Sequence, residues 1–275
     1  DTDAFLVTLP NGQIRGRELQ SGNNNTFYAF QEIPYAAPPV GGLRFKEPVP
    51  AEDWEGILDT TANTKICYQG TPSSTPNVSE TEDCLYLNVY TPVKPGDNSS
   101  DLLPVLFWIY GGSFLTGDGT YQLYGPTYFM DYGIIVVTIN YRLGPLGFLA
   151  TEDGVIPGNL GLKDQVFALK WTNQNIRLFG GDPEKITIIG ESAGGASVGL
   201  LQMSQRTAGL FRGAIIESGN ALSSWAHQPF ARHYAYQLGA ALDPNFSTDN
   251  TSEELLELLQ NTSASKIMTA SVTVS

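Results

Sequence analysis

Histidine, cysteine and positive charge are scarce in this 275-residue chain. It contains 2 His, 2 Cys and 15 Lys and Arg against 28 Asp and Glu, which gives a formal net charge of -13. The shortage of cations argues against binding to nucleic acid and against an electrostatic membrane anchor, because both need clustered Lys and Arg. No apolar run approaches the ~18 residues of a transmembrane segment. With 41% hydrophobic and 16% charged residues, the composition is still typical of a globular protein with a sizeable core.

Cys67 and Cys84 enclose a segment rich in Ser, Thr and Pro, which has little apolar content to hold it in place. A disulfide between them would close this segment, and two free buried thiols are the alternative. Six Asn-X-Ser/Thr sequons favour the disulfide, because so many acceptor motifs indicate a secreted, extracellular glycoprotein and an oxidising compartment. The predicted glycosylation sites are Asn24, Asn77, Asn98, Asn245, Asn250 and Asn261.

The alternation of strand and helix patterns, without an intervening linker, predicts one α/β domain with a mostly parallel sheet. Residues 4–16 read as two strands joined at Pro10-Asn11-Gly12, an antiparallel hairpin. Residues 30–60 are rich in Pro and Gly and are expected to form an ordered but irregular surface segment. Further strands are predicted at 85–92, 104–110, 134–140, 186–190 and 213–218. Helices are predicted at 162–179, 196–203, 226–241 and 252–260.

Gly190-Glu191-Ser192-Ala193-Gly194 fits the pattern G-x-S-x-G between a predicted strand and a predicted helix. A turn this tight needs small flanking residues and exposes the serine hydroxyl, so Ser192 is predicted to be a catalytic nucleophile. The backbone N–H of Ala193 opens the helix and is available to an oxyanion. A phosphate-binding turn is the alternative, but the lysine of that motif is missing.

A second set of oxyanion donors is expected in the Gly-rich segment at 108–119, WIYGGSFLTGDG. Glycines at 111 and 112 let the backbone approach a substrate closely. The N–H groups of Gly112 and Ser113, together with that of Ala193, would form a three-donor oxyanion hole. An ordinary turn is the alternative for this segment, and the serine motif downstream argues against it.

These motifs resemble the type-B carboxylesterase family, which includes cholinesterases and the long fungal lipases of the α/β-hydrolase fold. FGGDPEKITIIGESAGG at 179–195 resembles the serine signature of the family, and EDCLYLNVYTP at 82–92 resembles a second signature built on the disulfide cysteine. IPYAAPPVGGLRF, WIYGGSF, NYRLGPLGFL and GNLGLKDQ also match in the family's order, so that the resemblance runs from about residue 5 to about residue 220. It implies ester hydrolysis through a Ser-Glu/Asp-His triad, no cofactor and no metal, and a disulfide between Cys67 and Cys84.

The resemblance implies a carboxylesterase or lipase-like enzyme acting on a small-molecule or lipid ester. The sequence departs from the family's motifs at two places. The fourth residue of the oxyanion motif is Ser113 where the family often has Gly or Ala, and its N–H is unchanged. Residues 67–84 contain no Trp, the residue with which cholinesterases stack on choline, so a choline-selective site is not expected. Two other functions stay open: a non-catalytic adhesion or binding module on the same fold, and a serine amidase or peptidase. The intact serine and oxyanion motifs favour the esterase.

The histidine that would activate Ser192 is hard to find in this chain. His227 and His233 lie in a predicted helical stretch. Glu217, at the end of a predicted strand, could act as the acid with His227 as the base. Such a local triad is not favoured, because the family's acid and histidine lie on loops after later strands. The resemblance therefore implies that residues 1–275 are the N-terminal part of a single α/β-hydrolase catalytic domain, with the remaining triad members beyond residue 275. A segment without those later strands is expected to be insoluble or inactive alone.

Three other charged residues in the matched motifs have expected roles. Glu191, next to the nucleophile, is expected to be a buried group that supports the site and points away from the serine hydroxyl. Arg142 and Asp164 are expected to form a structural ion pair. The burial of Glu191 and the ion pair follow from the resemblance, and the direction of Glu191 follows from its place next to the serine.

Overall fold

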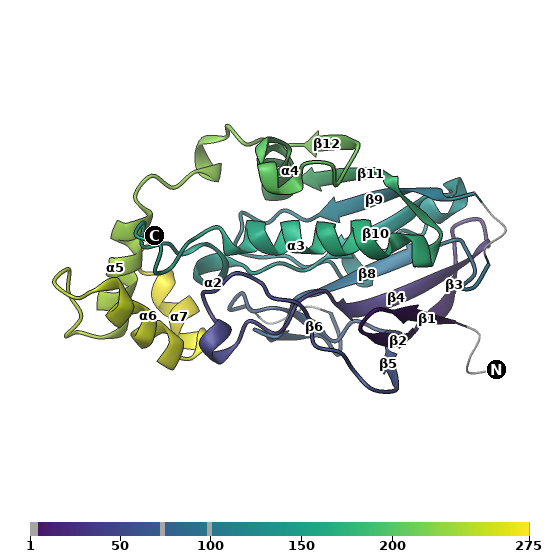
Figure 1. Ribbon diagram of the computed structural model, residues 1–275. Helices are drawn as coiled ribbons and strands as arrows, with labels where there is room; N and C mark the ends of the chain where they lie inside the picture. Colours follow the sequence, from purple (N-terminus) through teal and green to yellow (C-terminus); the bar gives the residue numbers. More distant parts are fainter. Residues whose placement is uncertain (1–4, 72–74, 98–100, 275) are drawn as a thin grey trace.

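The computed structural model describes residues 5–71, 75–97 and 101–274 as a mixed β-sheet flanked by helices (Figure 1). The strands are β1 Leu6–Leu9, β2 Gly12–Arg15, β3 Arg17–Gln20, β4 Thr26–Pro34, β5 Ile57–Asp59, β6 Lys65–Cys67, β7 Ser79–Thr81, β8 Tyr86–Thr91, β9 Leu103–Ile109, β10 Ile135–Ile139, β11 Gly181–Glu191 and β12 Gly213–Glu217. The α-helices are α1 Tyr121–Tyr124, α2 Gly144–Phe148, α3 Leu160–Asn175, α4 Ala193–Met203, α5 Ala231–Leu242, α6 Ser252–Asn261 and α7 Ala264–Ser271. The 3-10 turns are η1 Gly41–Leu43, η2 Phe129–Tyr132, η3 Ile176–Phe179, η4 Gln205–Thr207 and η5 Ser224–Ala226.

Within these residues the largest sheet has seven strands in the order β12-β11-β9-β10-β8-β4-β3. The half formed by β12, β11, β9 and β10 is parallel, as expected from the strand-helix alternation. The other half, formed by β8, β4 and β3, is antiparallel. The parallel half matters for function, because the carboxyl ends of its strands meet at one edge, where loops can form a site.

Helices α3 and α4 cover one face of the parallel half (Figure 1). The strands turn alternate apolar side chains toward these helices, as the two-residue period of a strand requires. The core beneath the helices includes Val105, Phe107, Ile109, Ile135, Val137, Ile139, Ile186 and Ile188 from the strands, and Val166, Leu169, Val198 and Leu201 from the helices. On the edge strand β12, Ile215 and Ile216 are 43% and 41% exposed.

The segment at 30–60 begins with more regular and more buried structure than the sequence analysis predicted. Its first part belongs to β4, a nine-residue strand that pairs with both β3 and β8. Phe30, Ile33 and Phe45 are fully buried. The expectation of an irregular surface segment is therefore wrong for this part, whose buried residues belong to a regular strand. The predicted hairpin at 4–16 is present as β1 and β2, which pair with β5 in a separate three-stranded sheet.

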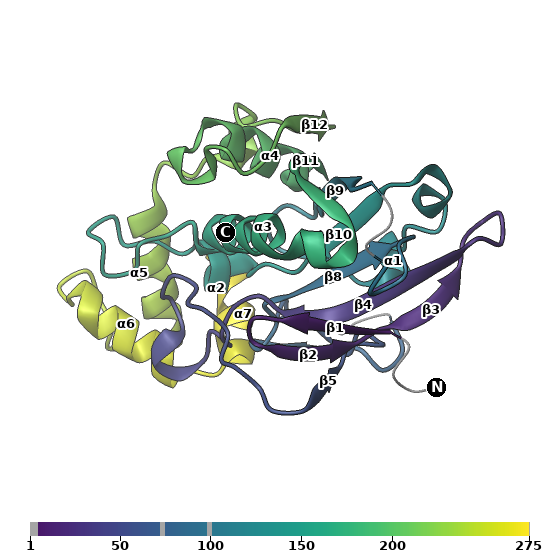
Figure 2. The same cartoon turned by 45° about the vertical axis from the view of Figure 1, so that its right-hand side comes forward.

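Helices α5, α6 and α7 pack together with α2, and α5 and α6 lie at the end of the molecule opposite β3 (Figure 2). Arg44 ties α6 to the rest of the chain, since its guanidinium donates to the carbonyls of Leu259 and Thr262 at 2.8 and 2.5 Å and pairs with Glu82. Predictions of helix at 226–241 and 252–260 agree with α5 and α6, whereas α7 was not predicted. Among the described helices, none has the length and hydropathy that crossing a membrane would require.

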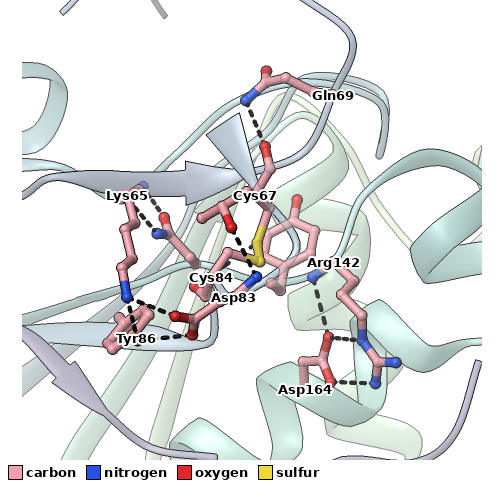
Figure 3. Close-up of a disulfide and its surroundings, with 12 residues drawn as sticks. Lys65, Cys67, Gln69, Asp83, Cys84, Tyr86, Arg142 and Asp164 are labelled. Carbon is pink, nitrogen blue, oxygen red and sulfur yellow. Dashed lines mark hydrogen bonds and ion pairs between the residues drawn. A yellow bond between two sulfur atoms is a disulfide. The ribbon is translucent and has the colours of Figure 1, made fainter. Parts of the chain in front are cut away.

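The expected disulfide joins Cys67, at the end of β6, to Cys84, just before β8, with Cα atoms 4.9 Å apart (Figure 3). Both cysteines are buried. The alternative of two free thiols is thereby excluded for these residues.

Reducing this disulfide is expected to lower the free energy of unfolding by roughly 3 kcal/mol, because the cysteines close a loop of 17 residues whose opening adds conformational entropy to the unfolded chain. Thermal unfolding of the full-length protein with and without reductant measures the effect. The double variant Cys67→Ala, Cys84→Ala is the control, and its Tm should not respond to reductant. An equal Tm for the oxidised and reduced wild-type protein would contradict the prediction.

Candidate active site

Ser192 is the single residue between β11 and α4, in the strand-turn-helix context that the motif predicted. Its backbone has φ 57° and ψ -120°, a conformation that non-glycine residues rarely adopt and that surrounding contacts must hold. Its N–H donates to the carbonyl of Glu217 at 2.9 Å, and its own carbonyl accepts from Ala196 at 2.9 Å. The side chain is half-buried, and its hydroxyl makes no hydrogen bond to the part of the chain that the structure describes. The serine therefore has a fixed backbone and a hydroxyl free to meet a ligand.

Residues 190–194, here called the elbow, form the turn around Ser192 between β11 and α4. Their glycines are required because the elbow packs closely against the end of β9. A Cβ atom on Gly194 would lie 2.0 Å from the carbonyl oxygen of Ile109, and one on Gly190 would lie 2.4 Å from the Gly194 carbonyl. A Cβ on Gly111 would lie 2.9 Å from the Cβ of Ser192. These distances show that the turn after β9 lies directly against the serine.

Residues 111–117, here called the oxyanion loop, follow β9 in an unusual conformation. Gly112, Ser113 and Phe114 have φ values of 105°, 58° and 62° in succession. The Gly112 carbonyl turns back into the loop and accepts from the N–H groups of Leu115 and Thr116, both at 3.0 Å. In a trans peptide the N–H points opposite to the C=O, so the N–H of Ser113 points out of the loop.

Three backbone donors near Ser192 remain unpaired. Among the described residues, the N–H groups of Gly112, Ser113 and Ala193 donate to no protein acceptor. Ala193 is the first residue of α4, where the N–H groups have no partner within the helix. Unpaired donors beside a serine hydroxyl are the arrangement that a developing oxyanion requires.

Glu191 is exposed, which corrects the expectation that it is buried. It ends β11 on the sheet face opposite α3 and α4, and its carboxylate lies beside Gly111, 3.0 Å from where a Cβ would be. Burial raises the pKa of Tyr124, and the negative charges of Asp118 and Glu191 raise it further. Glu191 therefore lies beside the oxyanion loop, on a side of the sheet that the described residues cover only in part.

Among the described residues, no local triad forms around Ser192. Glu217 ends β12 with an exposed side chain and contributes only its backbone carbonyl to the elbow. His227 follows η5 and His233 lies in α5, where its ring packs 5.7 Å from that of Tyr234; both are exposed. Within the described ranges, neither imidazole is hydrogen-bonded to Ser192 or to a carboxylate. The structure therefore gives these histidines no place in the site.

Arg142 and Asp164 form the expected ion pair, which is almost fully buried (Figure 3). The guanidinium donates through Nε and Nη2 to the two carboxylate oxygens at 2.8 and 2.7 Å. Burial alone would lower the pKa of Arg142, but the Asp164 carboxylate more than offsets this and raises it. The pair joins the segment after β10 to α3.

An apolar wall beside the oxyanion loop was not predicted from the sequence. The ring of Phe114 packs 4.9 Å from Phe148 and 6.5 Å from Trp225, measured between ring centroids. Trp225 is 51% exposed. Its sequence neighbourhood gives no signal of this placement, because the contact joins η5 to a distant loop.

The predicted glycosylation sites differ in their surroundings. Asn24, Asn77, Asn245 and Asn261 are exposed, and Asn98 lies outside the described residues. Asn250 is partly buried, and its side-chain amide donates to Glu254 in the capping box of α6. Their modification stays a prediction.

Known proteins resemble this chain over most of its length. The model of the carboxylesterase family matches residues 3–275. Venom carboxylesterase-6 of Apis mellifera is 45% identical over 264 residues, which are 95% of this chain and 46% of that protein. Juvenile hormone esterase of Tribolium castaneum is 48% identical over 222 residues, which are 80% of this chain and 37% of that protein. The crystal structure of juvenile hormone esterase from Manduca sexta, with OTFP covalently attached, matches with a TM-score of 0.89 at 35% identity, over 97% of this chain and 50% of that chain. The chain spans less than half the length of these two curated relatives.

Proposed function

Because this chain belongs to the carboxylesterase family, we propose that it supplies the nucleophile and the oxyanion hole of a serine carboxylic ester hydrolase. The observation that carries the proposal is the geometry of Ser192, held at φ 57° beside three unpaired backbone N–H groups. Such a serine exposes its hydroxyl at the end of the parallel strands, where an ester can approach.

In the proposed reaction Ser192 Oγ attacks the ester carbonyl carbon as its proton passes to a histidine. The carbonyl oxygen becomes an oxyanion and accepts hydrogen bonds from the N–H groups of Gly112, Ser113 and Ala193. The tetrahedral intermediate then expels the alcohol, which takes the proton from the histidine, and leaves an acyl-enzyme on Ser192. Water attacks the acyl group with the same histidine as base, releases the carboxylic acid and restores the serine.

The histidine and its acid are proposed to come from the part of the relatives' length that this chain does not match. His227 and His233 are unsuitable, because neither makes a contact that would orient an imidazole toward Ser192. On this proposal the 275 residues are one part of a catalytic domain. The six sequons and the buried disulfide support secretion of the protein, since both belong to an oxidising, extracellular route.

The substrate class proposed is a small-molecule or lipid ester with an apolar group. Phe114 and the exposed Trp225 form an apolar surface next to the oxyanion donors. Leu115, at the tip of the same loop, is 54% exposed. This surface suits an apolar acyl or alcohol chain.

Labelling by a fluorophosphonate probe tests the proposal directly. The full-length protein is expected to lose esterase activity as the probe adds to Ser192, because only an activated serine hydroxyl attacks the phosphorus at a useful rate. Mass spectrometry of the peptide containing residues 186–203 locates the adduct. A folded protein left unlabelled at Ser192 would contradict the proposal and favour the binding module. An amidase or peptidase would also be labelled, but it would hydrolyse amides such as p-nitroacetanilide, which an esterase is expected to leave intact.

A further inference from the structure

The oxyanion loop needs support from outside itself. It holds Ser113 and Phe114 at positive φ, in a region that L side chains rarely adopt, and Gly117 at φ 116°. Such conformations persist only where surrounding contacts fix them. Phe114 is fixed by the N–H of Gly144, which donates to its carbonyl at 2.8 Å.

The far end of the loop is held by the side chain of Gln69. Its Oε1 accepts from the N–H of Gly117 at 2.9 Å, and its Nε2 donates to the Gly117 carbonyl at 3.3 Å. One planar amide thus pairs with both backbone groups of a single residue. The same Nε2 also donates to the carbonyl of Cys67 at 3.2 Å (Figure 3). Gln69 therefore joins the oxyanion loop to the disulfide strand β6.

Moving Gly117 would also move the oxyanion donors. A Cβ there would lie 2.5 Å from the ring of Tyr110 and 2.9 Å from the Gly111 carbonyl, so the residue closes the loop onto its own beginning. Its neighbour Thr116 donates to the Gly112 carbonyl, which belongs to the same peptide as the N–H of Ser113. A shift of Gly117 would turn that peptide and move its N–H.

We propose that Gln69 is a positioning residue that holds the oxyanion loop in its catalytic conformation by pairing with Gly117. The proposal rests on the function proposed above for Ser192. Glutamine suits the role because its amide offers a donor and an acceptor in one plane. Leucine would offer neither, and glutamate would keep the acceptor but place an oxygen against the Gly117 carbonyl.

Gln69→Leu is expected to lower kcat about 10-fold with KM changed less than 2-fold, because removing an oxyanion donor outright lowers kcat 10²- to 10³-fold and misplacing one should do less. The affinity for a trifluoromethyl ketone, whose adduct with the serine carries an oxyanion, is expected to fall by the same factor as kcat/KM. A purely structural role would lower Tm without changing either quantity, when assayed well below Tm.

Gln260→Leu is the matched control, since its amide also donates to a backbone carbonyl, that of Arg44 at 3.2 Å, but lies in α6. Its kcat and ketone affinity should equal those of the wild type. Should Gln69→Leu not fold, Gln69→Glu is measured in the same way and is also expected to lose kcat and ketone affinity in parallel.

The outcomes separate this inference from the proposed function. A wild-type protein that reacts with fluorophosphonate at Ser192, together with a folded Gln69 variant of unchanged kcat and ketone affinity, overturns the role of Gln69 alone. A wild-type protein that fails to react at Ser192 overturns the proposed function and the inference with it. Parallel losses in the folded Gln69 variant, absent from Gln260→Leu, support both.

Discussion

Ser192→Ala is expected to abolish ester hydrolysis and leave the stability of the protein almost unchanged. The loss in kcat should be on the order of 10⁶-fold, because without the hydroxyl no acyl-enzyme can form, and only substrate binding and the oxyanion hole remain. Stability should change by less than about 0.5 kcal/mol, since the hydroxyl has no hydrogen-bond partner in the described chain and alanine introduces no clash. Steady-state hydrolysis of a p-nitrophenyl ester and thermal unfolding measure the two effects.

Ser197→Ala, in the helix α4 that follows Ser192, is the matched control with the opposite expectation. Ser197 is fully buried, and its hydroxyl accepts from Gln165 Nε2 at 3.1 Å. Removing this hydroxyl should lower the free energy of unfolding by about 1 kcal/mol and leave kcat unchanged. If Ser192→Ala kept measurable acyl-enzyme turnover, the nucleophile would lie elsewhere in the protein.

The elbow was accessible to sequence analysis because it is local. A buried strand, a G-x-S-x-G turn and a helix follow one another without a gap, and the structure has β11, Ser192 and α4 in that order. The α/β-hydrolase fold expected from the family motifs is confirmed by the structural match. The Arg142–Asp164 pair and the disulfide were also expected, from motifs that the resemblance supplied.

Features that depend on distant contacts were missed or mistaken. β4 was not predicted, since its pattern TFYAFQEIP is buried between two strands and does not alternate cleanly. Glu191 was expected to be buried, but its exposure depends on what covers that face of the sheet, which the motif does not contain. Gln69 and Trp225 reach the oxyanion loop only through the fold. The sequence motif thus predicts a nucleophile and its backbone donors, whereas contacts such as those of Gln69 and Trp225 are visible only in the folded chain.

Asp164→Ala is expected to destabilise the protein by about 3–5 kcal/mol, because it leaves the Arg142 guanidinium buried and without its counter-ion. The side chains of Arg142 and Asp164 are 5% and 0% exposed, so water cannot replace the lost partner. Asp59→Ala is the matched control: it breaks the Arg15–Asp59 pair, whose side chains are 39% and 56% exposed, and should lower stability by at most about 1 kcal/mol. Thermal unfolding of the full-length variants measures both, and equal losses would contradict the argument.

The same substitution should also lower the rate of fluorophosphonate labelling, because the pair fixes the backbone that supports the oxyanion loop. Besides its hydrogen bonds from the Arg142 guanidinium, the Asp164 carboxylate accepts from the backbone N–H of Arg142 at 3.1 Å. Two residues later, Gly144 N donates to the carbonyl of Phe114. Replacing both charges, by Arg142→Met with Asp164→Leu, should recover part of the stability, since no unpaired charge stays buried, while the missing bond to the Arg142 N–H should keep labelling slow. Full recovery of labelling in this double variant would show that charge burial alone, and not the anchoring of the loop, accounts for the defect.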